Sequence, residues 1–279
     1  RPRPGISPDL FNHFLLDRAV FMELEELGPA LPPLERVLVP CKMSEALESA
    51  YRDLDQQLRD AIKERMNGKG PPSLAATRVQ ALDAFLDKPW AWEPIRAPAF
   101  DDKGRRCGSS VVAVPLDLGV NHVDEKDHKL VEIVQQELKQ GRRCAIYPQF
   151  TGVHDVRGKL LKLLTDVGVR ACILPDTVKP EAREAWIERH TAEIDVLICH
   201  PKRVMTGLDL IAFPSLVWYQ VGYSTHVLRQ ASARARRPMQ TKACKVFFLY
   251  YAGTIQDKAL ALMGEKEAAS QALEGVFDT

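Results

Sequence analysis

The residues best suited to chemistry lie between Thr225 and Lys245, where the sequence reads THVLRQASARARRPMQTKACK. This stretch contains six Lys/Arg and no Asp/Glu. Gln230, Arg234 and Arg237 follow the spacing Q-x-x-x-R-x-x-R, and on a helix residues i, i+4 and i+7 share one face. Guanidinium groups suit phosphate because they donate two hydrogen bonds side by side. The spacing predicts a helix over residues 225–237 that presents one amide and two guanidiniums to a phosphate.

Other parts of a nucleotide-hydrolysing site are missing from these 279 residues. The phosphate-binding loop G-x-x-x-x-G-K-[S/T] does not occur; the nearest strings are GKG at 68–70 and GKL at 158–160. Residues 124–128 read DEKDH, which superficially resembles an acidic Mg²⁺-binding box, but no apolar strand precedes them. They instead predict a helix N-terminus, where the helix dipole favours acids. No C-x-x-C pair occurs, and no metal site is predicted.

Composition limits the class of protein. At ~150 residues per domain, 279 residues allow one or two domains, and 46% hydrophobic with 27% charged residues is ordinary globular composition. Because 38 Lys+Arg balance 37 Asp+Glu, any site for a polyanion must be local. No apolar run approaches the ~20 residues that span a bilayer, no secretory leader opens the chain, and the cysteine usage fits a reducing compartment. The chain starts with Arg1, so we expect a piece of a longer protein.

From about residue 124 the pattern is a regular alternation of helices and short apolar strands. Strands are expected at 144–147, 171–174, 196–199, 216–219 and 244–251, and helices at about 125–140, 153–166, 180–190, 225–237 and from 255. Strands that are apolar throughout predict an α/β fold: a parallel sheet with helices on both faces. Functional residues of such sheets gather at the carboxyl ends of the strands.

The first 123 residues are expected to be a mainly helical connector with a hairpin insertion. A helix is predicted at 10–27, a strand at 35–41, a helix capped by Ser44, another helix at about 74–86, and a hairpin within 94–120. In the helix after Ser44, the side chains of Leu47, Tyr51, Leu54 and Leu58 form an amphipathic stripe. We therefore predict two regions, the connector at 1–123 and the sheet domain at 124–279.

The stretch around Gln230 resembles motif VI of superfamily-two helicases, in particular Swi/Snf-type DNA translocases, whose form is Q-A-x-x-R-x-x-R-x-x-Q-T-K. Further blocks match in order and spacing: QFTG at 149–152, LPDT at 174–177 with Arg183, GLDL at 207–210, and GTIQDK at 253–258. The loop at 200–206, HPKRVMT, departs from the family's S/T-x-x-A-G-G, which indicates a divergent branch. The resemblance covers most of the chain and identifies its second part as the C-terminal RecA-like lobe of such a motor.

The resemblance implies roles for individual residues. Arg234 and Arg237 would act as arginine fingers, and Gln230 would orient the phosphate or the attacking water. Gly207 and Asp209 would line the nucleotide cleft, with Asp209 placed to accept from a ribose hydroxyl. The DNA backbone would contact the remaining candidates, with Thr151 and Gly152 at the start of a helix: Thr151, Gly152, Thr177, Lys202 and Arg203.

The resemblance also implies the partners. ATP and Mg²⁺ would be held mainly by an N-terminal RecA-like lobe, so this part alone would be inactive. DNA would be bound without sequence specificity, and the protein would be cytoplasmic, at the nucleoid or otherwise DNA-associated. A non-catalytic RecA-like module that binds DNA or protein is the alternative. A third hypothesis, an unrelated α/β enzyme lobe such as a sugar-nucleotide transferase, is disfavoured because no G-x-G-x-x-G turn occurs.

Overall fold

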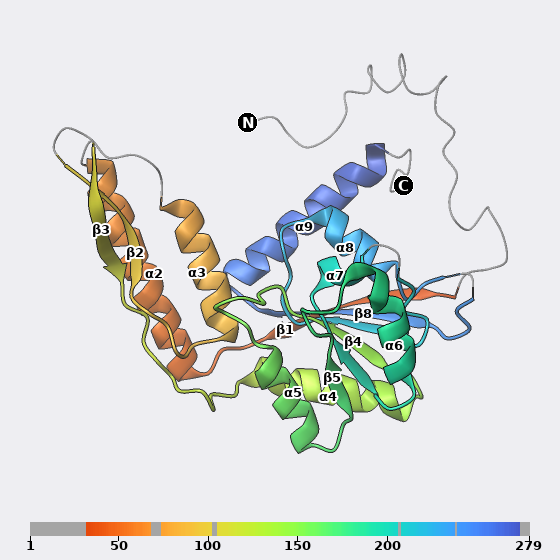
Figure 1. The fold of residues 1–279 in the computed structure, drawn as a ribbon. Coiled ribbons are helices and arrows are strands. Elements are labelled where there is room, and N and C mark those ends of the chain that lie inside the picture. The colour runs from red at the N-terminus through yellow and green to blue at the C-terminus, as the bar shows by residue number, and fades with distance from the viewer. Residues whose placement is uncertain (1–31, 68–73, 102–104, 206–207, 238, 274–279) are drawn as a thin grey trace, which may run out of the picture.

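The computed structural model describes residues 32–67, 74–101, 105–205, 208–237 and 239–273. The helix predicted at 10–27 lies outside these ranges. Six strands form one sheet: β1 (Leu34–Cys41), β4 (Cys144–Tyr147), β5 (Ala171–Ile173), β6 (Val196–Ile198), β7 (Ser215–Trp218) and β8 (Cys244–Tyr251). Their order is β1-β8-β7-β4-β6-β5, and every pair is parallel (Figure 1). The predicted RecA-like α/β sheet is confirmed.

Helices cover both faces of this sheet (Figure 1). On one face α4 (Glu125–Lys139) and α5 (Arg157–Asp166) pack on side chains such as Cys144 and Ile146 of β4. On the other face α6 (Arg183–Thr191), α7 (Pro201–Val204), α8 (Thr225–Ser232) and α9 (Ile255–Leu273) pack on side chains such as Ala145 and Tyr147. A short 3-10 turn, Pro180–Ala182, precedes α6. Alternate residues of β4 thus enter two different cores, which is why this strand has no charged position.

The DEKDH stretch begins α4, as predicted. Asp124 is the N-cap residue and forms a capping box with Asp127. The Asp124 carboxylate also accepts hydrogen bonds from the backbone N–H and the hydroxyl of Ser44. Ser44 in turn accepts from the N–H of Leu47 and caps α2 (Glu45–Asn67), so the starts of α2 and α4 are tied together.

The helical insertion consists of α2 (Glu45–Asn67), α3 (Ala75–Asp87) and the antiparallel hairpin β2 (Ile95–Phe100) and β3 (Arg106–Ala113). It projects to one side of the sheet (Figure 1). The predicted stripe of α2 is largely buried: Leu47, Leu54 and Leu58 are fully covered, against Phe85 and neighbours of α3. The division at residue 123 remains a prediction, but β1, from the predicted connector, pairs with β8 along its length and is a strand of the sheet.

Two predicted helix bounds are wrong. α8 ends at Ser232 rather than at 237, because Arg234 leaves the helical pattern: its N–H donates to Ala231 O and its C=O accepts from the N–H of Leu210. α5 begins at Arg157 rather than at 153, because Asp155 forms a turn with Gly152 and its carboxylate accepts from the N–H of Arg157. Thr151 and Gly152 therefore do not lie at the start of a helix, contrary to the prediction.

Candidate functional site

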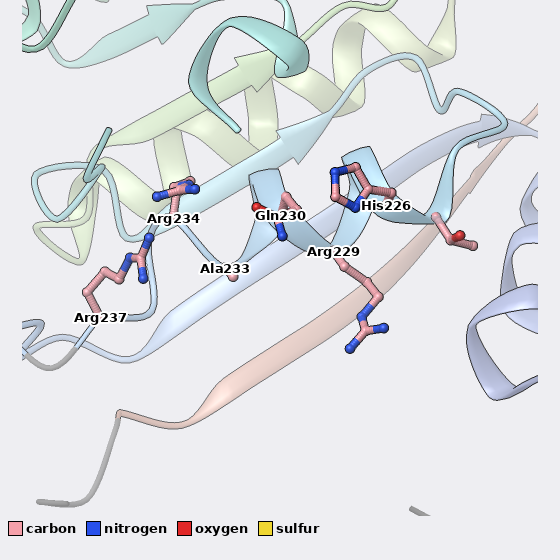
Figure 2. Close-up of a pocket in the computed structure, with 7 residues that line it drawn as sticks. His226, Arg229, Gln230, Ala233, Arg234 and Arg237 are labelled. Atoms are coloured by element: carbon pink, nitrogen blue, oxygen red, sulfur yellow. The ribbon is translucent and has the colours of Figure 1, made fainter. Parts of the chain in front are cut away.

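The strongest candidate site is built on α8. Ser224 caps this helix by accepting from the N–H of Val227, and Val227, Leu228 and Ala231 are buried against the sheet. Residues at i, i+3, i+4 and i+7 from His226 lie on one face of the helix and line an open pocket of about 640 Å³. Its lining is Thr225, His226, Arg229, Gln230, Ala233, Arg234 and Arg237 (Figure 2).

The sequence did not predict how three side chains are positioned in this pocket: those of Gln230, Arg234 and Arg237. Gln230 is an exposed residue on α8, whereas Arg234 and Arg237 follow the end of the helix. Figure 2 shows their guanidinium groups next to each other beyond the last turn. The chain turns immediately after Ser232, so the three side chains converge without sharing a helix face.

Arg234 is anchored by backbone carbonyls. Its guanidinium donates to Leu208 O at 3.3 Å and to Met205 O, while its Nε is buried without a hydrogen-bond partner. Burial, and then the neighbouring charge of Arg237, lowers the pKa of Arg234 from its usual value. The fold therefore places two like charges side by side in a partly covered pocket, an arrangement that favours an anionic ligand.

Arg237 lies in the same pocket and is 35% exposed. Its Nε is 3.0 Å from Asp209 Oδ1, an ion pair whose angle leaves the Nε proton without a hydrogen-bond acceptor. Asp209 is thus next to a residue of the pocket, with its carboxylate facing Arg237, and its proposed role in a nucleotide cleft stays a prediction. Gly207 lies outside the described residues.

The residues proposed for DNA lie on loops that follow three neighbouring strands, β4, β6 and β5. Thr177 is exposed in a turn after β5, and Lys202 is exposed in α7 after β6. Thr151 and Gly152 lie in the loop after β4. Arg203 differs from these, because its guanidinium is bound to Asp176, 2.9 Å from Oδ1. The structure brings these loops together at the carboxyl ends of the strands. Of the two proposed cations, Lys202 and Arg203, Arg203 already pairs with Asp176.

Sequence reasoning assigned no role to four other residues of the pocket and missed one residue of the loop cluster. The four pocket residues are Thr225, His226, Arg229 and Ala233, and the spacing of four between His226 and Gln230 was a usable signal. Arg157 begins α5 and contacts both Asp155 and Asp176, a pairing that no sequence pattern indicated. Within the described ranges, no group of three His, Cys, Asp or Glu is placed to hold a metal ion, and no helix is long and apolar enough to cross a membrane.

Comparison with known proteins supports the resemblance. No family model matches the chain. Helicase SWR1 of Cryptococcus neoformans is 24% identical over 75% of this chain, an uncharacterized ATP-dependent helicase of Mycoplasma pneumoniae is 24% identical over 53%, and the chromatin-remodeling ATPase INO80 of Candida albicans is 27% identical over 53%. The matches span only 17%, 14% and 10% of these relatives, so the chain corresponds to one part of them.

A solved structure has the same fold. The C-terminal part of the Fun30 ATPase domain superimposes with a TM-score of 0.62, covering 88% of this chain and 99% of that one at 15% identity. The similarity to Swi/Snf-type helicases is therefore confirmed at the level of sequence, and the RecA-like fold at the level of structure.

Proposed function

We propose that this chain is the C-terminal motor lobe of an ATP-dependent DNA helicase or translocase. The observation that carries the proposal is the convergence of Gln230, Arg234 and Arg237 on one open pocket, in which the Nε atoms of both guanidiniums are buried and have no hydrogen-bond acceptor. A module that only bound DNA or protein through other surfaces would have no use for this arrangement. The similarity to a helicase and to a chromatin-remodeling ATPase supports the same proposal.

The residues of the pocket fit a triphosphate that is presented from outside this lobe. Arg234 is held in place by the carbonyls of Met205 and Leu208, so little reorganisation is needed when charge develops opposite it. Arg237 is more exposed and would reach across a closing cleft, and its removal from Asp209 frees that carboxylate for a ribose hydroxyl. Gln230 would orient the phosphate or the attacking water. Bound ATP with Mg²⁺ would supply the phosphoryl group for transfer, and both would be held mainly by an N-terminal RecA-like lobe.

The DNA backbone would be bound at the edge formed by the loops after β4, β5 and β6. Thr151, Gly152, Thr177, Lys202 and Arg203 are the proposed contacts, and such contacts carry no sequence information. Lys202 also lines a small pocket with Ser224 and Leu228, at the start of α8. The helix that carries Gln230 therefore begins beside a proposed DNA contact and ends at the proposed arginine fingers. Binding should weaken steeply as salt rises, because phosphate contacts release counterions.

The test uses the full-length protein and the variant Arg237→Ala. An arginine finger contributes roughly 10³–10⁵ to the rate of phosphoryl transfer, so DNA-stimulated ATP hydrolysis should fall by about 10³ while nucleotide binding is retained. Arg236→Ala is the matched control, because Arg236 is adjacent in sequence but its Nε donates to Pro32 O, away from the pocket. Turnover within about tenfold of wild type in Arg237→Ala would refute the role. A full-length protein without ATPase activity would favour the non-catalytic RecA-like module instead.

A further inference from the structure

A cluster of charged side chains lies at the carboxyl ends of β4 and β5 and is only partly explained by the proposed contacts. Asp155 and Arg157 follow β4, and Asp176 follows β5. Arg203 is the fourth member of the cluster and lies in α7, the short helix that follows β6. The Arg203 carbonyl accepts from Arg183 Nη1 at 3.0 Å, which fixes this turn against α6.

The guanidinium of Arg157 has two hydrogen-bonding edges, and a different carboxylate occupies each. Nε and Nη2 donate to Asp155 at 2.9 and 2.7 Å. Nη1 and Nη2 donate to Asp176 Oδ1 and Oδ2 at 2.8 and 2.9 Å. The Arg157 side chain is 10% exposed, whereas that of Asp176 is 44% exposed. Asp155, 31% exposed, occupies the Nε–Nη2 edge, and the more exposed Asp176 occupies the Nη1–Nη2 edge.

Arg203 approaches the same carboxylate. Its Nη2 is 2.9 Å from Asp176 Oδ1, and its Nη1 donates to the backbone carbonyl of Asp176 at 3.1 Å. The hydrogen bonds from Arg157, followed by the charges of Arg157 and Arg203, lower the pKa of Asp176, so it is an anion at neutral pH. Two guanidiniums thus converge on one surface anion, which is the arrangement that a phosphate group takes.

We propose that Arg157 and Arg203 form a binding site for a nucleic-acid backbone phosphate, and that the Asp176 carboxylate occupies this site in the DNA-free protein. This inference rests on the proposed function and adds Arg157 to its DNA contacts. The carboxylate and the phosphate both accept the parallel hydrogen bonds of a guanidinium fork, so they compete for one place. Because Asp155 stays bound to the Nε–Nη2 edge, Arg157 keeps its orientation when Asp176 leaves. Asp176 then sets the affinity for DNA as well as excluding weaker anions.

The competing explanation is that Asp176 only ties the loops together. The two explanations predict opposite signs for Asp176→Asn, which keeps the shape of the side chain and removes its charge. If the Asp176 carboxylate competes with phosphate, removing its charge lets DNA bind more tightly. If it only holds the loops together, removing its charge loosens the loops and weakens DNA binding.

The experiment measures the affinity of the full-length protein for a labelled duplex of about 30 bp, by anisotropy, between about 50 and 200 mM salt. Asp176→Asn should bind about 3–10-fold more tightly, and Arg157→Gln about tenfold more weakly with a salt slope smaller by about one phosphate. In the double variant the gain from Asp176→Asn should be smaller, because Arg203 is then the only guanidinium of the proposed site that the substitution frees.

The matched control is Asp195→Asn. Asp195 forms a similar bidentate pair with Arg170, with N–O distances of 2.9 and 2.7 Å. Arg170 precedes β5 and Asp195 precedes β6, so this pair lies at the amino ends of the strands, opposite the proposed site. This variant should bind DNA as wild type does. Asp176→Ser, compared by thermal unfolding, serves as a second probe if Asp176→Asn folds poorly, and it should also bind more tightly.

Unchanged or weaker binding in folded Asp176→Asn and Asp176→Ser overturns the inference and leaves the proposed function standing when wild type still binds DNA and hydrolyses ATP. Wild-type protein that binds no duplex overturns both.

Discussion

Lys126 offers a sharp test of how the helical insertion is joined to the sheet. This residue lies on α4 with no exposed surface, and its ammonium donates to Asp87 Oδ1 at 2.8 Å and to Gln256 Oε1 at 3.0 Å. It also sits 4.7 Å from the ring centre of Tyr219. Asp87 is the last residue of α3 and is equally buried. We consider Lys126→Met, which keeps the length of the side chain and removes its charge.

The expected cost follows from what remains after the substitution. Removing one partner of a buried ion pair costs about 3–5 kcal/mol, because the other charge stays buried without compensation. Asp87 Oδ2 keeps hydrogen bonds from Gln220 at 3.1 Å and Gln256 at 2.9 Å, which places the expected loss at the lower end, about 3 kcal/mol. Replacing Asp87 by Asn in the same chain removes the stranded charge and should recover at least about half of this loss.

Equilibrium unfolding in urea, followed by circular dichroism, measures the effect. With a slope of about 3 kcal/mol/M, the midpoint of Lys126→Met should fall by about 1 M. Lys162→Met is the matched control, because Lys162 pairs with Asp166 on the exposed side of α5, 68% and 58% exposed, and such pairs contribute about 0.5 kcal/mol or less. A loss below about 1 kcal/mol in Lys126→Met, or no recovery in the double variant, would show that this reasoning is wrong.

Three further predictions concern other parts of the chain. Burial, and then the charge of Asp87, raises the pKa of Asp83 to about 7. The folded state therefore favours the protonated form, so stability should fall as the pH rises from about 4 to about 7 and then level off. The unfolding free energy, measured against pH, should fall by up to about 4 kcal/mol over this range, and Asp83→Asn should remove this slope. Cys107 is exposed and the other five cysteines are buried or half-buried, so native protein should show one fast thiol in a colorimetric titration, and Cys107→Ser should abolish the fast phase; a second fast thiol would contradict this. Ser44→Ala removes the cap of α2 and the bond to Asp124, and thermal melts should show a loss of about 1–2 kcal/mol rather than none.

Much of the fold could be predicted because local patterns in this sequence report burial directly. The four-residue apolar strand Cys144–Tyr147 has both faces covered, and its unbroken hydrophobicity indicated this. The stripe through Leu47, Leu54 and Leu58 marked the buried face of α2. The acids at 124–127 predicted the start of α4, because the helix dipole favours acids in the first turn.

The candidate site could be predicted in its chemistry but not in its geometry. The types and spacing of Gln230, Arg234 and Arg237 indicated a phosphate-binding role, and all three line one pocket. The helix that should have aligned them ends at Ser232, because the Arg234 carbonyl and guanidinium bind a loop more than twenty residues earlier. Partners that are distant in sequence decide where a helix of marginal length ends, and no periodicity encodes them.

The sequence by itself determined which segments are buried, which helices are capped and which side chains carry the chemistry, since each of these depends on residues within a few positions of one another. Only the tertiary structure decided that β1 pairs with β8, that Asp209 faces Arg237, and that Asp176 lies between Arg157 and Arg203. These are pairings of charges and backbone edges across 19 to over 200 residues. The ion pairs form once the parallel strands bring their loops together, because the free energy of a charge pairing depends on distance in space.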